Sequence, residues 1–237
     1  FADIHGNLEA LTAVLSALKS EGVDQYFCCG DIVGYGANPC ECILEVKKAG
    51  SVCVAGNHDW AVVQKIGTEN FNAHAKAAVD WTRAQISPSD KEFLKCLDLV
   101  YSTDDFILVH GTLDCPQDFN YLTDVDQAAR SFALMRRPIG FVGHSHIPKI
   151  FVEKNGRVMD ASKSCKSEIA SGCRSIINVG SVGQPRDGNP KAAYCLFDSK
   201  DKTIEIKRVE YDIASARNKI VEAGLPSQLA SRLMFGK

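Results

Sequence analysis

Five short clusters of polar residues contain all but one of the six histidines of this chain. In chain order the clusters are Asp3-Ile4-His5, Gly30-Asp31, Gly56-Asn57-His58-Asp59, His110-Gly111 and Gly143-His144-Ser145-His146. Carboxylate, amide and imidazole groups in combination suit Mn, Fe or Zn better than Ca or Mg, and the clusters lack the thiolates of a structural zinc site. Two ions about 3.5–4 Å apart, bridged by a carboxylate, would use all these ligands and clamp a phosphorus atom for in-line displacement.

The elements that must position these clusters are β-strands, because a strand-length apolar run precedes four of them. The runs are residues 25–29, 51–55, 106–109 and 139–142. Neighbouring parallel strands end on one edge of a sheet, where open α/β folds place their sites. We therefore expect the clusters to converge in space.

The remaining pattern predicts a first part of alternating strands and helices and a second part rich in strands. Helices are expected at residues 7–20, 38–48, 70–85, 90–97, 125–134, 213–223 and 227–235, and further strands at 149–153, 175–179, 192–197 and 203–209. No internal repeat or linker divides the chain, so residues 1–237 are expected to form a single domain.

Charge and hydropathy exclude two classes of partner. The net charge is −2 without a dense basic block, which argues against binding of long nucleic acid and against a nuclease. The apolar runs are far shorter than the ~20 residues of a membrane span. A small phosphorylated substrate is the expected partner, and the sequence leaves open whether the chain forms oligomers.

The ordered clusters resemble the signature of the calcineurin-like metallophosphoesterase superfamily, which is D-x-H, GD, GNH(D/E), H and GH-x-H. All five blocks occur between Asp3 and His146. The resemblance implies an α/β (α+β) fold, a four-layer αββα sandwich with two mixed β-sheets flanked by helices. The stretch from Gly180 to Arg186 is also similar to the bacterial and archaeal branch that contains small phosphodiesterases and dinucleoside tetraphosphatase-like proteins.

The resemblance also implies which residues hold metal. The two ligand sets would share Asp31 as the bridging carboxylate: Asp3, His5, Asp31 and His146 for one ion, and Asp31, Asn57, His110 and His144 for the other. A hydroxide that bridges the two ions would attack phosphorus. His58 would face the substrate, where it donates a proton to the leaving oxygen or stabilises the charge of the transition state.

Three further residues are candidates for binding the phosphate: Asn7, Tyr35 and Arg186. Protein Ser/Thr phosphatases and the symmetric dinucleoside tetraphosphatases carry GD-x-V-D-R-G, and here Gly34 and Tyr35 replace that Asp and Arg. We therefore expect small phosphodiesters or nucleoside polyphosphates as substrates. A phosphomonoesterase or protein phosphatase is the alternative enzyme, and a non-catalytic interaction module similar to the retromer subunit Vps29 is the alternative outside enzymology.

Simpler interpretations of single motifs remain open. A His-x-His pair can arise by coincidence, Asp-x-His can precede a helix cap, Tyr35 can be an aromatic residue in a turn, and Arg186 can be a solvated surface residue. Five clusters at strand ends are explained more simply by one dinuclear site than by separate coincidences.

The start of the chain and its ten cysteines bear on processing and location. Asp3 stands only two residues after the first residue, so we expect part of the natural N-terminal strand to be missing.

Cys40 and Cys42 have the C-x-C spacing of a chelating pair but should point to different sides of a helix. Cys28, Cys29, Cys53 and Cys195 lie in predicted strands, so we expect reduced core residues and a cytoplasmic location.

Overall fold

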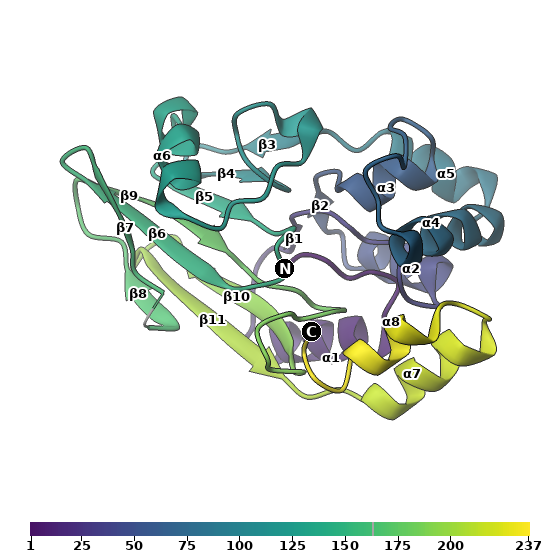
Figure 1. Cartoon of the computed structure of the whole chain (residues 1–237). Coiled ribbons are helices and arrows are strands. Elements are labelled where there is room, and N and C mark those ends of the chain that lie inside the picture. Colours follow the sequence, from purple (N-terminus) through teal and green to yellow (C-terminus); the bar gives the residue numbers. More distant parts are fainter. Residues whose placement is uncertain (163) are drawn as a thin grey trace.

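Two β-sheets pack face to face in the computed structural model, which describes residues 1–162 and 164–237 (Figure 1). The larger sheet has six strands in the order β3-β4-β5-β9-β6-β7. β4, β5 and β9 are parallel neighbours, whereas β3, β6 and β7 pair antiparallel. The strands are β3 (Val100–Ser102), β4 (Phe106–Val109), β5 (Ile139–Val142), β6 (Lys149–Lys154), β7 (Arg157–Asp160) and β9 (Cys173–Asn178).

The second sheet is assembled around the first residues of the chain. β1 (Phe27–Cys28) pairs in parallel with β2 (Val52–Cys53), and β10 (Ala192–Asp198) pairs antiparallel with β11 (Thr203–Val209), which also pairs with β8 (Lys166–Glu168). Residues 1–2 and 181–182 join these two groups of strands. Cys29 N–H donates to the Phe1 carbonyl, Val182 N–H to the Ala2 carbonyl, and Ala193 N–H of β10 to the Ser181 carbonyl, all at 2.9 Å.

Apolar side chains fill the space between the sheets. Phe106, Ile139 and Ile177 from the larger sheet pack with Cys29 and Ile204 from the smaller one, and all are buried. Full burial of a side chain of this size contributes about 1.5–3 kcal/mol. This intersheet core therefore holds the two sheets together.

Helices cover both outer faces. α6 (Val125–Leu134) buries Phe132 against the larger sheet, whereas α1 (Leu8–Ser20) packs beneath β10 and β11 (Figure 1). α1 begins after its N-cap Asn7 and buries the stripe Leu11, Val14 and Leu18. The other helices are α2 (Pro39–Lys48), α3 (Asn57–Val62), α4 (Ala73–Gln85), α5 (Pro88–Lys95), the short 3₁₀ helix η1 (Pro116–Asp118), α7 (Ile213–Glu222) and α8 (Ser227–Arg232). The four-layer αββα arrangement is the one expected from the sequence.

The predicted helices and strands are present, with shifts at their ends. α4 starts at Ala73, after residue 70, because the Asn72 side chain accepts the Ala75 N–H at 3.0 Å and caps the helix there. The elements α3, η1, β3, β7 and β8 have no counterpart in the prediction. No helix in the part of the chain that the structure describes has both the length and the apolar character to cross a membrane.

Candidate metal centre

The five polar clusters converge at one edge of the two sheets. Asp31 follows β1, Asn57 and His58 open α3 after β2, His110 follows β4, and His144 with His146 follows β5. Asp3 and His5 follow the extended N-terminal residues that lie beside β1. The sequence-based expectation of convergence is confirmed, because these side chains form three overlapping groups with ligand atoms within 4.8 Å of one another.

The backbone at this edge is strained. Five of the candidate ligands have positive φ angles, namely Asp3 (54°), His5 (51°), Asp31 (55°), His144 (67°) and His146 (61°). Residues other than glycine rarely adopt this left-handed conformation, which costs of the order of 1–3 kcal/mol each and is concentrated at functional sites. The surrounding fold therefore holds these side chains in place against a local preference for other conformations.

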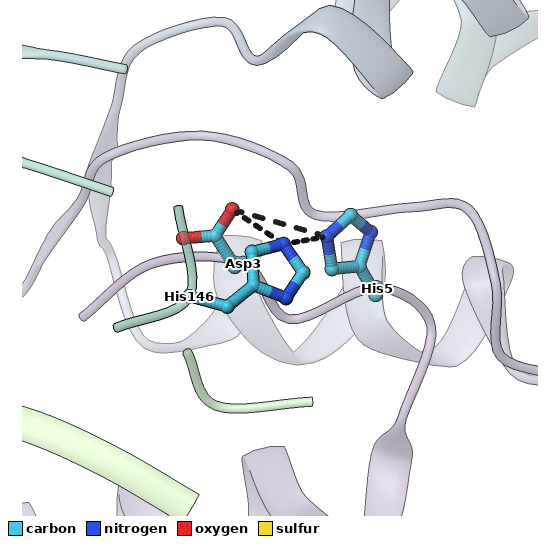
Figure 2. A group of neighbouring side chains, drawn as sticks. All are labelled: Asp3, His5 and His146. Atoms are coloured by element: carbon cyan, nitrogen blue, oxygen red, sulfur yellow. Dashed lines mark hydrogen bonds and ion pairs between the residues drawn. The ribbon is translucent and has the colours of Figure 1, made fainter. Parts of the chain in front are cut away.

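Asp3, His5 and His146 form the first group, and their side chains point toward one spot (Figure 2). His146 Nε2 lies 3.4 Å from Asp3 Oδ1, and His5 Nε2 lies 3.8 Å from the same oxygen. The two Nε2 atoms are 3.0 Å apart. Three donor atoms thus surround one small volume.

Asp31, His110 and His144 form the second group. His110 Nε2 lies 3.1 Å from His144 Nδ1 and 3.3 Å from the Asn57 amide oxygen. Asp31 Oδ2 lies 3.3 Å from His110 Nε2 and 3.6 Å from His5 Nε2. One carboxylate therefore stands between the two groups.

Backbone carbonyl groups fix the orientation of three of the imidazoles. Val33 O lies 3.1 Å from His5 Nδ1, Cys29 O lies 2.7 Å from His110 Nδ1, and Gln184 O lies 2.6 Å from His146 Nδ1. A carbonyl oxygen only accepts, so each Nδ1 carries a proton, and in the neutral form of each ring the lone pair of Nε2 then points inward. Two such lone pairs 3.0 Å apart repel unless a cation lies between them. The donor set therefore fits metal ions.

The charge balance of the centre agrees with this fit. Burial lowers the pKa of His5 and His146 well below the usual range and that of His144 to about 3, so these rings are neutral, as metal ligands must be. Burial opposes charge on His110 as well, but the neighbouring Asp31 raises its pKa to about 10. The carboxylate of Asp31 thus draws positive charge to the middle of the site.

Asp59 organises the loop that carries Asp31. Its carboxylate accepts N–H groups from Asp31 at 2.9 Å, Ile32 at 2.9 Å and Gly56 at 3.0 Å. Gly56 is required at this approach, because a Cβ there would lie 2.0 Å from Asp31 Oδ1. Sequence analysis placed Asp59 in a cluster but gave it no role, and the structure identifies it as a support for the central carboxylate.

His58 lies beside the ligands in a box of aromatic rings. Its ring centroid is 4.5 Å from that of Tyr35, 4.8 Å from that of His5 and 5.0 Å from that of Phe71. Burial lowers its pKa to about 4, and its Nδ1 has no hydrogen-bond partner among the described residues. A Cβ on Gly34 would lie 2.4 Å from this Nδ1. His58 belongs with His5 and Asp31 to the third group of neighbouring ligand atoms, and packing against rings holds it without a hydrogen bond at Nδ1 from the residues described.

Two of the three candidate phosphate-binding residues reach the centre. The buried Tyr35 ring lies 4.4 Å from the His5 ring, and Arg186 Nη2 donates to the Tyr35 hydroxyl at 3.4 Å and to Gln184 Oε1 at 2.9 Å. Asn7 differs, because its Oδ1 accepts the Ala10 N–H at 3.1 Å and its Nδ2 donates to the Gly183 carbonyl at 2.9 Å. These contacts use the Asn7 amide to cap α1 and to hold a loop.

Two aromatic residues at the site were missed by sequence analysis. Tyr121 stacks on His144 with centroids 4.1 Å apart and planes 12° from parallel, and Phe119 meets the His110 ring edge-on at 5.9 Å. Both lie in the loop between β4 and α6. The only signal was two aromatic side chains in a turn-rich stretch, which does not identify what they contact.

The cysteines take no part in the groups of candidate ligands found in the described residues. All ten are unpaired thiols. Burial raises the pKa of Cys29 and Cys195 to about 12, which fits their place in the core between the sheets.

Comparison with known proteins links this geometry to a family. The profile of the calcineurin-like phosphoesterase superfamily domain matches residues 1–202. The chain is 42% identical over 242 aligned residues to the uncharacterized protein MJ0912 of Methanocaldococcus jannaschii, with 100% of this chain and 96% of the relative covered. The crystal structure of a metallophosphoesterase from Sphaerobacter thermophilus superposes with a TM-score of 0.86 at 37% identity, covering 100% of this chain and 97% of the other. Protein PH1004 from Pyrococcus horikoshii OT3 shares the fold, with a TM-score of 0.82 at 22% identity and the same coverage of 100% and 97%.

Proposed function

This chain belongs to the calcineurin-like phosphoesterase superfamily and is a phosphate-ester hydrolase, and from that premise we propose that it uses two metal ions to cleave small phosphodiesters or nucleoside polyphosphates. The observation that carries the proposal is the position of Asp31, whose Oδ2 lies 3.3 Å from His110 Nε2 in one donor group and 3.6 Å from His5 Nε2 in the other. Asp3, His5 and His146 would complete one ion's ligands, and Asn57, His110 and His144 the other's. Mn, Fe or Zn suits this mixture of oxygen and nitrogen donors.

Two bound ions would supply a nucleophile at neutral pH, by lowering the pKa of water, and would neutralise charge on the phosphate. The protein's own share is to orient these groups before substrate arrives. The carbonyl groups behind His5, His110 and His146 hold a proton on each Nδ1, so that Nε2 is the nitrogen aimed at the centre. Asp59 holds the Asp31 loop in register with α3.

His58 is the proposed proton donor or charge stabiliser at the leaving oxygen. It touches His5 and Tyr35 and stands outside the two ligand sets. Arg186 and Tyr35 are the proposed contacts to phosphate, because a half-buried guanidinium and a phenol hydroxyl lie together beside His5.

Tyr35 favours diesters and anhydrides over monoesters. A phosphate monoester carries nearly two charges at neutral pH and needs cationic groups beyond the metals, whereas a diester carries one charge. Tyr35 brings a neutral ring where protein phosphatases have a cation. Gly34 accommodates His58, because a Cβ there would lie 2.4 Å from the His58 Nδ1. The same features make a phosphopeptide a poor match.

One assay on metal-reconstituted protein tests the proposal. With Mn²⁺, kcat/KM should be higher for bis-p-nitrophenyl phosphate or diadenosine tetraphosphate than for p-nitrophenyl phosphate, and elemental analysis should give two ions per chain. A clear preference for the monoester would favour the phosphomonoesterase. Absence of turnover with both ions bound would favour a non-catalytic interaction module.

A further inference from the structure

Tyr121 presents an aromatic face at the edge of the candidate metal centre. One face of its ring covers His144, with 4.1 Å between centroids, yet the residue is 48% exposed. A single exposed aromatic residue is ordinary on a protein surface, so the significance of Tyr121 lies in its position beside the candidate ligands. The exposed part of this ring lies one stacked ring away from a proposed metal ligand.

The loop that carries Tyr121 is anchored on both sides. Before it, the buried Phe119 packs edge-on against Trp60 with 5.7 Å between centroids. After it, Leu122 is buried in the core under α6, and the Lys149 ammonium donates to the Thr123 carbonyl at 2.7 Å. The ring is therefore held in position before any ligand binds, which lowers the entropic cost of stacking against it.

A cationic group stands at the same centre. Arg186 Nη2 donates to the Tyr35 hydroxyl at 3.4 Å, and the guanidinium lies 5.7 Å from the centroid of the Tyr35 ring. The Tyr35 ring in turn lies 4.4 Å from the His5 ring. An aromatic surface and a guanidinium at one centre suit an aromatic ring that carries phosphate.

We propose that Tyr121 is a stacking platform for the nucleobase of a nucleotide substrate whose phosphate lies at the metal centre. The inference rests on the proposed function for the position of the phosphate, and it narrows the substrate class to phosphates that carry an aromatic ring. Every base offers a π face, so this contact binds bases with little preference among them. Parallel rings stack in an offset arrangement with centroids about 4.5–7 Å apart.

Equilibrium binding of AMP and ribose 5-phosphate in the presence of Mn²⁺ tests the platform without requiring turnover. The two probes share ribose and phosphate and differ only in adenine, so the ratio of their dissociation constants isolates the contribution of the base. Calorimetry on wild-type protein should show AMP binding about tenfold more tightly. In Tyr121→Leu the ratio should fall toward one, whereas Tyr121→Phe and Tyr121→Trp should keep it.

Tyr101→Leu provides a matched control, because Tyr101 is a partly exposed tyrosine on the edge strand β3. Its replacement should leave the ratio at the wild-type value. A wild-type ratio near one, or an unchanged ratio in Tyr121→Leu, would overturn the platform. If Tyr121→Leu does not fold, Tyr121→Trp provides the test. A ratio of dissociation constants that falls to one in Tyr121→Trp would overturn the platform. Failure of wild-type protein to hydrolyse any phosphate ester would instead overturn the proposed function, and the binding ratio would still report on Tyr121.

Discussion

The candidate metal centre and the intersheet core lie next to each other and are built on opposite principles. The core consists of apolar residues in regular strands, such as Ile139 and Ile177. The centre consists of buried polar residues on loops, many with positive φ angles and with nitrogen lone pairs turned toward one another. The core stabilises the fold, whereas the centre depends on that fold to keep a locally unfavourable arrangement.

The comparison separates stability from function. Replacing a core side chain should lower the free energy of unfolding and spare the chemistry of each folded molecule. Replacing a side chain of the centre should abolish or reduce activity and leave the fold intact.

The largest effect is expected for Asp31→Asn. The amide carries no charge and cannot serve two ions as a carboxylate does, so bound metal and activity should be lost together, while the circular dichroism spectrum stays that of the wild type. Elemental analysis and turnover of bis-p-nitrophenyl phosphate measure the two losses. Two ions per chain in the variant would show that Asp31 is not the bridging ligand.

A smaller loss is expected for His58→Ala, which leaves both ligand sets complete. The kcat should fall by about 10²–10⁴-fold, the range for general acid–base catalysis, with metal content nearly unchanged. Esters with p-nitrophenolate as leaving group should suffer less than alkyl esters, because that leaving group needs no protonation. Equal losses for both would assign His58 to stabilising charge on the phosphoryl group.

The core should respond in the opposite way. Ile177→Ala removes a fully buried side chain between the sheets and should lower the free energy of unfolding by about 2–5 kcal/mol. Denaturant titration measures this loss, and kcat of the folded variant should remain close to that of the wild type. A loss of metal from folded Ile177→Ala would mean that core and centre are not separable.

The smallest effect is expected for Arg186→Ala. Removing one charge-assisted contact worth ~1.5 kcal/mol should raise KM about tenfold for the best substrate. Tyr35→Phe keeps the ring against His58 and removes the hydroxyl that Arg186 contacts, so it serves as the milder companion variant. An unchanged KM in Arg186→Ala would remove this residue from the phosphate site.

Sequence alone predicts the residues that meet at the centre but not how they are held. His110-Gly111 and the other clusters can be recognised because few residue types bind metal, and because strand ends converge. The support from Asp59 and the packing of His58 against Gly34 depend on distances between loops that are far apart in the chain. In the sequence, Gly34 shows only that the second Asp of the GD-x-V-D-R-G motif is absent. The structure shows why a glycine is needed there, because a side chain would collide with His58.

Helices and strands show the same difference between features that local sequence defines and features that tertiary contacts define. α6 was predicted with its observed bounds because the capping box of Asp124 and Gln127 and an apolar stripe define it locally. β8, with the sequence Lys166-Ser167-Glu168, lacks any apolar alternation, and its pairing with β11 decides its conformation. Tyr121 reaches His144 only because the preceding loop turns through left-handed residues at Cys115 (φ 53°) and Phe119 (φ 50°).

The contact between the two ends of the fold also sets the order in which the centre can form. Ser181 Oγ donates to the Asp3 carbonyl at 2.8 Å across 178 residues of sequence. Contacts of such long range form slowly, and during synthesis Asp3 must wait until Ser181 has left the ribosome. Metal uptake should therefore come late in folding. In refolding experiments it should lag behind the recovery of the native circular dichroism spectrum, and simultaneous appearance of the two signals would contradict this order.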